Sequence, residues 1–254
     1  MKQEENIYIY KDTFLSLLTL IKILINKNSK PQNIKNELYS PTLLDNIIDL
    51  EIYEDKEILN YWKTKTTYSI LKTAYYIFLS EEENKELIIF YFLLNSLKYK
   101  DKIFYMRNLN CVNKALKISH YVSNENHRFK GFTRFKELNN NIFYAEITPE
   151  NNILFLLSNH FKTRLKNEYW IIKDIKRQIL SIYDKKNFQI IDSNRLKIDN
   201  KLCKDESDIE NLWKNFYKTI GIAERKNDRC RMNFMPKKYW KTLIEMSDEY
   251  EKSN

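Results

Sequence analysis

Hydrophobic side chains in the first half of the chain recur every three to four residues, which indicates amphipathic helices. The first such run, residues 14–25, follows a short alternating strand at residues 7–10, and Asp12 or Thr13 can cap the helix. A polar loop follows at residues 26–36. Further helical runs cover residues 58–78, 87–97 and 112–121. The aromatic stripes on these runs favour core packing over a cofactor site.

Beyond residue 131 the period changes to two, which is typical of strands. Residues 132–138 and 142–147 alternate on either side of three asparagines, and asparagine tolerates the backbone of a tight hairpin turn. A helix is predicted for residues 149–165, capped by Thr148 or Asn151. Strand-like runs then cover residues 169–175, 179–183 and 188–191.

The end of the chain is helical again. A polar connector at residues 193–205 precedes a capping-box pattern formed by Ser207 and Glu210, and the following helix carries Leu212, Phe216, Ile220 and Ala223 on one side. A last helix follows Pro236. The pattern as a whole predicts an α+β protein, with a helical N-terminal half followed by a small antiparallel sheet packed with helices. We expect two domains, a mainly helical region with a short first strand at residues 1–126 and an α+β core with basic helices at residues 127–254.

Composition narrows the class of protein. The chain has 254 residues, no long uncharged apolar stretch and a polar start, so we expect a cytoplasmic protein without membrane contact. Its three dispersed cysteines exclude a disulfide framework and an iron–sulfur cluster held by this chain alone. Two glycines are too few for a P-loop or a dinucleotide-binding motif, and the three histidines lack metal-site spacing. We therefore expect neither a cofactor nor a metal.

Positive charge is concentrated near the C-terminus. The net charge is +9, and residues 213–241 hold nine Lys and Arg against two Asp and Glu, an excess of seven. Such an excess in one segment is the electrostatic pattern of a nucleic-acid-binding surface.

Residues 127–136, HRFKGFTRFK, interleave cations with aromatic rings around Gly131. As a strand, this stretch would place Arg128, Lys130, Phe132 and Arg134 on one face. The cations could then contact phosphates while Phe132 stacks on an extruded base. The alternative is an ordinary solvated strand whose phenylalanines fill the core.

Two other clusters are candidates. Asp174 lies beside the Lys176-Arg177 turn, either as a general base or, more simply, as an ion-paired turn residue, and Glu146 on the neighbouring strand could approach it. The C-terminal cations are candidates for phosphate contacts, with helix solvation as the alternative. They are Lys218, Arg225, Lys226, Lys237 and Lys238.

Several long segments occur along the chain in a characteristic order: IYIYKDTF, LSEEE, HRFKGFTRF, YAEITPENN, NHFKTRL, WIIKDIKR, WKNFYKTIGIAERKN and FMPKKYW. Through these segments the chain resembles a DNA-metabolism or DNA-repair protein family whose core is a domain of unknown function. The resemblance implies genes located beside a radical SAM protein similar to spore photoproduct lyase. It also implies a relation to a domain fused to uracil-DNA-glycosylase-like proteins. It supplies no catalytic residues, so whether the chain is itself an enzyme stays open.

These observations lead to one main expectation. The chain is expected to be a DNA-binding accessory subunit that positions damaged or modified DNA for a radical SAM partner. It would contact the DNA backbone through the cations named above, including Lys176 and Arg177. One alternative is a DNA glycosylase or lyase that acts through Asp174 or Glu146. The other is a protein-binding adaptor without DNA contact.

Overall fold

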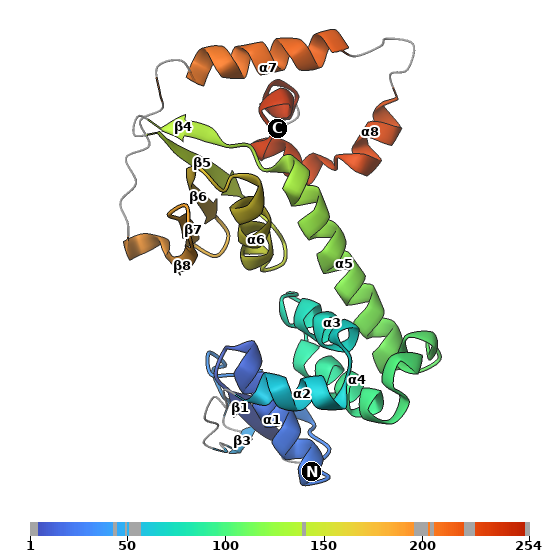
Figure 1. The fold of residues 1–254 in the computed structure, drawn as a ribbon. Coiled ribbons are helices and arrows are strands. Elements are labelled where there is room, and N and C mark those ends of the chain that lie inside the picture. Colours follow the sequence, from blue (N-terminus) through green and yellow to red (C-terminus); the bar gives the residue numbers. More distant parts are fainter. Residues whose placement is uncertain are drawn as a thin grey trace. The chain divides into compact units, whose positions relative to one another are not determined.

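The computed structural model describes residues 5–42, 45–48, 50, 57–138, 141–195, 203, 206–220 and 227–251 (Figure 1). The chain divides into two compact units, Met1–Asn124 and Glu125–Asn254. Each mixes helices with strands, so the protein is an α and β protein throughout. No helix in the described residues is long and apolar enough to cross a membrane.

Unit 1 begins with a three-stranded parallel sheet. Its central strand β1 (Glu5–Tyr10) pairs with β2 (Asn33–Asn36) on one side and with β3 (Asp45–Ile48) on the other. Helix α1 (Phe14–Asn26) connects β1 to β2, and the Thr13 hydroxyl caps it by accepting from the Ser16 amide at 3.1 Å. The predicted first strand, helix and cap are confirmed.

The predicted loop at residues 26–36 is wrong in its second half, because β2 lies there. Only Ile34 of this strand is fully buried, so its four residues carry too little hydrophobic pattern to indicate a strand. These residues form a strand because they pair in parallel with β1. The N-terminal unit is therefore not simply helical.

Helices form the rest of unit 1 and its core. They are α2 (Ile58–Lys65), α3 (Tyr68–Phe78), α4 (Lys85–Tyr99), the 3-10 helix η1 (Lys100–Tyr105) and the first part of α5 (Asn110–Phe132). Trp62, Phe90 and Phe92 are buried in this core, and the Trp62 indole donates to the Leu18 carbonyl at 3.2 Å. The aromatic stripes thus serve packing.

Helix α5 carries most of the stretch that was predicted to be a strand. Its last turns include Arg128, Lys130 and Phe132, so the expected face of alternating cations does not exist. The buried residues Val122, Glu125, Asn126 and Phe129 recur at helical spacing. Gly131 has a negative φ, and a Cβ there would meet nothing within 4 Å, so this glycine creates neither a bulge nor a close approach.

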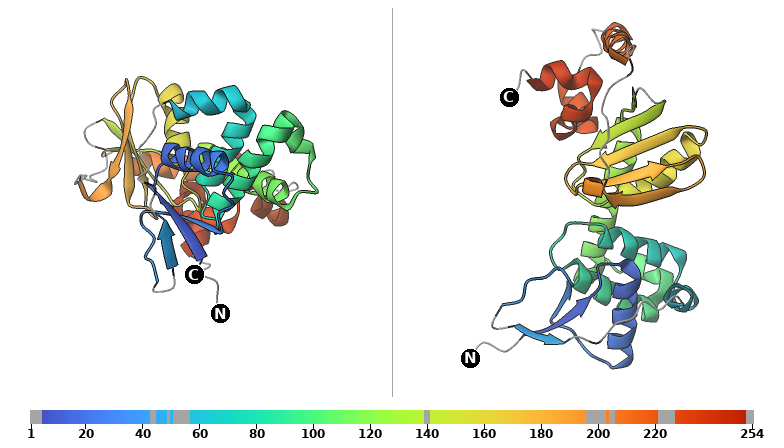
Figure 2. Two further views of the ribbon diagram at one scale, coloured as in Figure 1. Left: turned by 90° about the horizontal axis from the view of Figure 1, so that it is seen from below. Right: turned by 90° about the vertical axis from the view of Figure 1, so that its left-hand side faces the viewer.

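Unit 2 contains a five-stranded sheet in the order β4-β5-β6-β7-β8, whose strands lie side by side in the right-hand view of Figure 2. The strands are β4 (Lys136–Leu138), β5 (Ile142–Ile147), β6 (Tyr169–Asp174), β7 (Ile179–Tyr183) and β8 (Phe188–Asp192). The predicted hairpin is present as β4 and β5, and Asn141 in its turn has a φ of 55°.

The sheet is mixed rather than antiparallel, which corrects the prediction. Strands β5 and β6 are parallel, because α6 (Leu154–Arg164) connects them as a crossover helix. The N-cap residue of α6 is Ile153, not Thr148 or Asn151, and no side chain caps the helix.

The two faces of this sheet have different partners. Helix α6 packs on one face, where the Ser158 hydroxyl donates to Ser181 at 2.6 Å. The opposite face carries a small apolar cluster of Leu138, Tyr144, Ile171 and Leu180.

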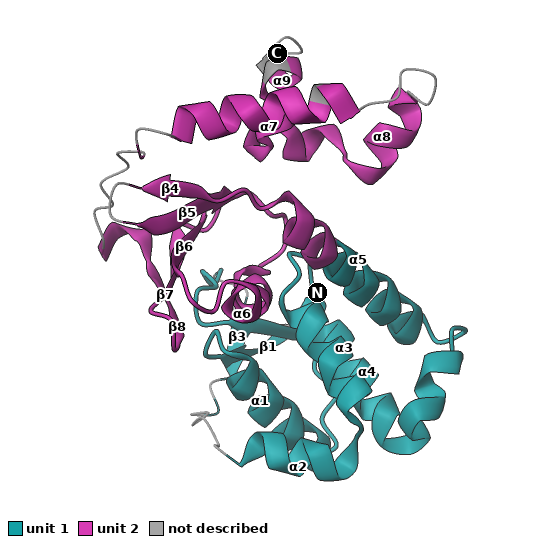
Figure 3. Cartoon of the chain, turned by 45° about the horizontal axis from the view of Figure 1, so that its top comes forward, with its two compact units in different colours: residues 1–124 teal, residues 125–254 magenta. Residues whose placement is uncertain are grey.

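The described part of the C-terminal segment of unit 2 is helical. Its helices are α7 (Glu206–Ile220), α8 (Asp228–Phe234), the 3-10 helices η4 (Lys237–Thr242) and η5 (Ile244–Met246), and α9 (Ser247–Glu251). Another 3-10 turn, η2 (Ser193–Arg195), follows β8. The predicted helix after Pro236 is a series of 3-10 turns around the buried Tyr239, Trp240, Leu243 and Met246. In Figure 3 the boundary between the two units falls within α5.

Candidate nucleic-acid interface

Residues 133–135, between α5 and β4, form an irregular segment. The Thr133 amide and hydroxyl both donate to the Phe129 carbonyl, which ends the helix. Arg134 is then held by Glu245, with Nη2 at 2.6 Å from Oε1 and Nε at 3.3 Å from Oε2. The ring of Trp213 lies 5.7 Å from the Arg134 guanidinium. Arg134 thereby links the segment after α5 to the C-terminal segment.

Glu245 stays ionised in this contact. Burial alone would raise the pKa of Glu245. The hydrogen bonds from Arg134 and the positive charge of Arg134 outweigh this effect, and the pKa lies below its ordinary value. The Trp213 indole donates to Glu245 at 3.1 Å as well. The three side chains therefore form one hydrogen-bonded group.

Two adjoining cavities lie beside Arg134, since both are lined by Arg134, Glu210 and Ile244. One, of about 340 Å³, is lined by Lys136, Lys214 and Lys241. The other, of about 540 Å³, has a more aromatic wall. Its aromatic and cationic lining residues are Phe135, Phe143, Phe161, Trp213, Lys130 and Arg164.

Cations outnumber carboxylates around the two cavities. Six Lys and Arg line them against three Glu, and the cations remain in excess when Glu245 is added. Glu210 pairs with Lys136 at 2.6 Å, and Glu206 accepts from the Glu137 amide at 3.0 Å. Lys130, Arg164 and Lys241 have no ion pair within the part of the chain that the structure describes.

Two pKa shifts reflect these surroundings. The pKa of His160 is lowered by burial and then by the positive charges of Lys130 and Arg164. Burial and the hydrogen bond to Glu146, 2.8 Å long, raise the pKa of Tyr144, so its hydroxyl stays protonated and donates. Glu146 is thus occupied as a hydrogen-bond acceptor.

The structure brings Lys176, Arg177 and Lys238 together, but all three donate hydrogen bonds to acceptors within the protein. Arg177 donates to Asp174 at 2.9 Å and to the carbonyls of Pro149 and Glu150. Lys176 donates to the Glu150 carbonyl at 3.1 Å, and Lys238 to the Glu150 carboxylate at 2.6 Å. These three cations stabilise one turn of the fold.

Asp174 and Glu146 do not form a pair of carboxylates. In the parallel register Ile147 faces Asp174 and Glu146 faces Lys173, so the two acids lie on opposite faces of the sheet. Asp174 is fully buried and ion-paired with Arg177. The expected approach of the two acids is wrong, while a role for either alone stays a prediction.

The remaining predicted residues are scattered. Phe132 is half-buried against Tyr239, with ring centroids 5.4 Å apart, so it is a packing residue rather than a free stacking surface. Arg128 is half-buried on α5, and Lys237 lies 5.7 Å from the Trp240 ring. The Lys218 side chain and all of Arg225 and Lys226 lie outside the described residues.

Sequence reasoning missed several residues that line the cavities, chiefly Lys136, Arg164, Trp213, Lys214 and Lys241. Lys136 ends the stretch of interleaved cations and aromatics, and the last three lie in the basic segment 213–241. The amino-acid composition of these two segments therefore indicated a basic surface, without indicating which residues form it. Only the tertiary structure around Arg134 shows which of these residues share a surface.

Fold and cavities define a mixed α and β protein with a cation-rich surface site. Residues 83–245 match a family described as a domain of unknown function, DUF4130. The match covers well over half of the chain, so the protein belongs to this family. No curated protein matches the chain. In the described parts of the chain, no three His, Cys, Asp or Glu side chains are grouped to hold a metal ion.

Proposed function

We propose that the protein binds nucleic acid, and specifically DNA, at the two cavities beside Arg134, as an accessory subunit that presents DNA to a partner enzyme. One observation carries the proposal. Residues 130–136 place Lys130, Arg134 and Lys136 on the cavity walls and Phe135 on the wall of the 540 Å³ cavity, and cations exceed carboxylates around the two cavities together. Nucleic acids offer phosphates to the first kind of group and base faces to the second.

Each cavity has its own role in this proposal. Lys241, which has no ion pair in the described part of the chain, contacts backbone phosphates, for which lysine is a suitable point charge. Trp213 offers a ring that is 40% exposed and oriented by its bond to Glu245, so an unpaired base can stack on it. Arg134 holds this ring in place from within the protein.

The positions of the Glu146 and Asp174 carboxylates agree with an accessory role. Catalysis by a pair of acids needs both at one reacting centre, where they flank the bond that breaks, and Glu146 and Asp174 lie on opposite faces of the sheet. In the proposal, the chemistry is supplied by the radical SAM partner that the family resemblance implies. Copurification with that partner without any DNA binding would instead favour a protein-binding adaptor.

The proposal is tested by the anisotropy of labelled single-stranded and duplex DNA, titrated between about 50 and 200 mM salt. Affinity should fall steeply with salt. Lys241→Gln should weaken binding and reduce the slope of log K against log salt by about one. Lys186→Gln removes the same charge from an exposed turn that lines neither cavity, and should change little. A flat salt dependence, or equal effects of the two variants, contradicts the proposal.

Stacking is tested separately on Trp213. Trp213→Ala should cost about 1–3 kcal/mol of binding free energy for a single-stranded oligonucleotide. Trp213→Phe, which keeps an aromatic face but loses the hydrogen bond to Glu245, should retain most of the affinity. Equal losses in both variants would show that Trp213 acts only by supporting Glu245.

A further inference from the structure

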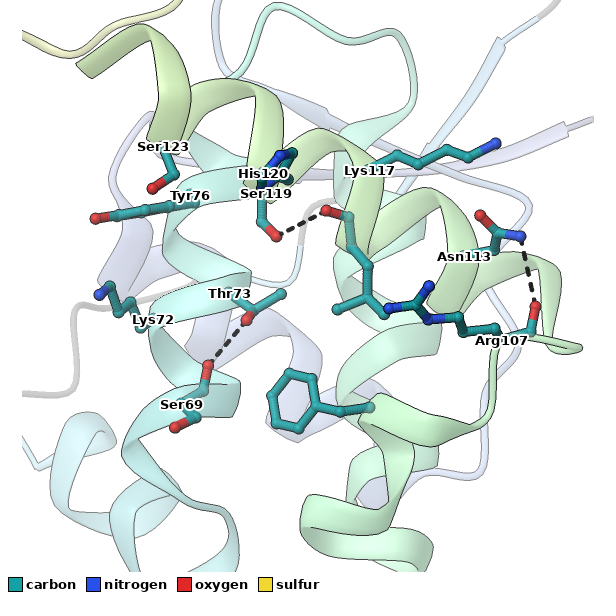
Figure 4. A pocket seen from close by; sticks show the side chains of 12 residues that line it. Ser69, Lys72, Thr73, Tyr76, Arg107, Asn113, Lys117, Ser119, His120 and Ser123 are labelled. Carbon is teal, nitrogen blue, oxygen red and sulfur yellow. Dashed lines mark hydrogen bonds between the residues drawn. The ribbon is translucent and has the colours of Figure 1, made fainter. Parts of the chain in front are cut away.

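Unit 1 contains a cavity that no sequence motif indicated. It has a volume of about 630 Å³ and lies between α3 and the first part of α5, next to η1. In Figure 4 the side chains of Ser69, Thr73 and Tyr76 lie on one wall, and those of Asn113, Ser119 and Ser123 on the other. The remaining lining residues are Lys72, Phe104, Arg107, Leu116, Lys117 and His120.

Helical periodicity explains why polar groups gather here. The α3 wall contains residues 69, 72, 73 and 76, and the α5 wall contains residues 113, 116, 117, 119, 120 and 123, so each wall is one face of its helix. The opposite stripe of α3 carries the buried Ile70, Leu71, Ala74 and Ile77. The core thus positions the two polar stripes on a surface hollow.

The charge of this cavity is entirely positive. Lys72, Arg107 and Lys117 line it, and none of its twelve lining residues is acidic. None of the three cations forms an ion pair within the residues that the structure describes. Lys72 lies 5.5 Å from the Tyr76 ring, which sets its direction without neutralising its charge. An anion would therefore meet three uncompensated positive groups.

Neutral donors complement these charges. The hydroxyls of Thr73 and Ser119 donate to the carbonyls of Ser69 and Leu116. In the described part of the chain, the hydroxyls of Ser69, Tyr76 and Ser123 have no hydrogen-bond partner and can donate to a ligand. Oxygen-rich anions with several acceptors match this mixture of charged and neutral donors.

We propose that this cavity is a binding site for closely spaced phosphate groups on a nucleotide-sized anion. Its volume lies in the range of small-molecule sites. Arg107 can bind a phosphate with its planar fork, and Lys72 and Lys117 act as point charges from the two facing helices. The phosphates come from a free nucleotide or polyphosphate, or from the end of a nucleic-acid strand.

The test is isothermal titration of the full chain with tripolyphosphate, ATP and a short single-stranded oligonucleotide. Lys117→Gln and Arg107→Gln should each weaken binding about tenfold, the effect of losing a charge-assisted hydrogen bond. Lys114→Gln is the matched control, because Lys114 is an exposed lysine on the same helix that does not line the cavity. Arg107→Lys should recover part of the affinity.

The probes separate the two sources of phosphate. Tripolyphosphate or ATP binding that depends on Lys117 identifies a free phosphate ligand, whereas Lys117-dependent binding of the oligonucleotide alone identifies nucleic acid. No saturable binding of any probe, or equal effects of Lys117→Gln and Lys114→Gln, overturns the proposal. Because Lys117 and Lys241 belong to different units, failure here leaves the proposed interface beside Arg134 standing, and the reverse holds too.

Discussion

Two groups of cations in this protein have opposite surroundings. At the turn after β5, Lys176, Arg177 and Lys238 each donate to Pro149, Glu150 or Asp174. In the cavity of unit 1, Lys72, Arg107 and Lys117 meet no carboxylate among the residues that line it. The first group is the one that stands out in the sequence, through the adjacent Lys176 and Arg177 beside Asp174. Its side chains form hydrogen bonds within the protein.

The difference shows that local charge density in the sequence does not indicate which cations have a partner within the protein. A Lys or Arg contributes to ligand binding when its charge is not already neutralised by a partner. That condition depends on residues distant in sequence, since Lys238 and Glu150 are 88 positions apart. We therefore expect the paired cations to affect stability and the unpaired ones to affect binding.

The largest expected effect is on stability, from Arg177→Ala. The Arg177 side chain pairs with Asp174, whose side chain has 0% exposure, so the variant leaves a buried carboxylate without its cation. The expected loss is about 3–5 kcal/mol in the free energy of unfolding, measured by urea denaturation. The double variant Asp174→Asn with Arg177→Ala removes the unpaired charge and should recover part of the loss. No recovery would mean that Arg177 acts mainly through the Pro149 and Glu150 carbonyls.

Glu245 should give a smaller effect that depends on pH. Glu245→Gln weakens the bond to Arg134 and should cost about 1–3 kcal/mol at pH 7. The pKa of Glu245 is lower in the folded state than in the unfolded chain, where it is about 4.3. Its stabilising effect is therefore complete above that value and is lost as pH falls through the folded-state pKa. Urea denaturation of the wild-type protein and of Glu245→Gln, measured from pH 7 to pH 3, should show the difference in their free energies of unfolding decreasing as pH falls.

The smallest expected effect on stability is at the unpaired cations. Lys117→Gln should change the free energy of unfolding by less than about 0.5 kcal/mol, because the side chain is exposed and pairs with no carboxylate in the described residues. A thermal melt compared with that of Lys114→Gln checks this. A clear loss of stability would place Lys117 with the structural cations instead.

Much of the secondary structure could be predicted from sequence. The strand and capped helix at the start, the later helices of unit 1 and the strands of unit 2 follow from periodicity that neighbouring residues create. The exception is instructive, because residues 127–132 alternate cations and aromatics like a strand and yet end a helix of 23 residues. Phe129 fits the pattern of a strand and that of a helix. The burial of Val122, Glu125 and Asn126 on the same side as Phe129 favours the helix.

The interface was less predictable than the fold. The sequence indicated that residues 127–136 and the segment 213–241 matter, and parts of both line the cavities beside Arg134. The sequence pattern predicts Phe132 as the stacking residue, but Phe132 packs against Tyr239. The pattern does not indicate Trp213, which lines one of the cavities. A one-dimensional pattern cannot say which aromatic ring has a neighbour, because Tyr239 lies more than a hundred residues away.

Helix α7 makes the same point for apolar side chains. Its pattern predicts one apolar side, and Leu212, Phe216 and Ile220 are indeed on one stripe, yet all three are more than half exposed. Periodicity establishes that a helix is amphipathic. It does not establish that another part of the chain covers the apolar side.

By itself, the sequence determined most helices and most strands, the mixture of α and β structure, and the excess of positive charge, because these depend on nearby residues or on composition alone. The tertiary structure decided the parallel pairing of β5 with β6, the separation of Glu146 from Asp174, and which cations have partners. These depend on contacts between distant segments, such as Arg134 and Glu245 at 111 positions apart. Such contacts form only when the chain has folded, and they decide which cations stay available to a ligand.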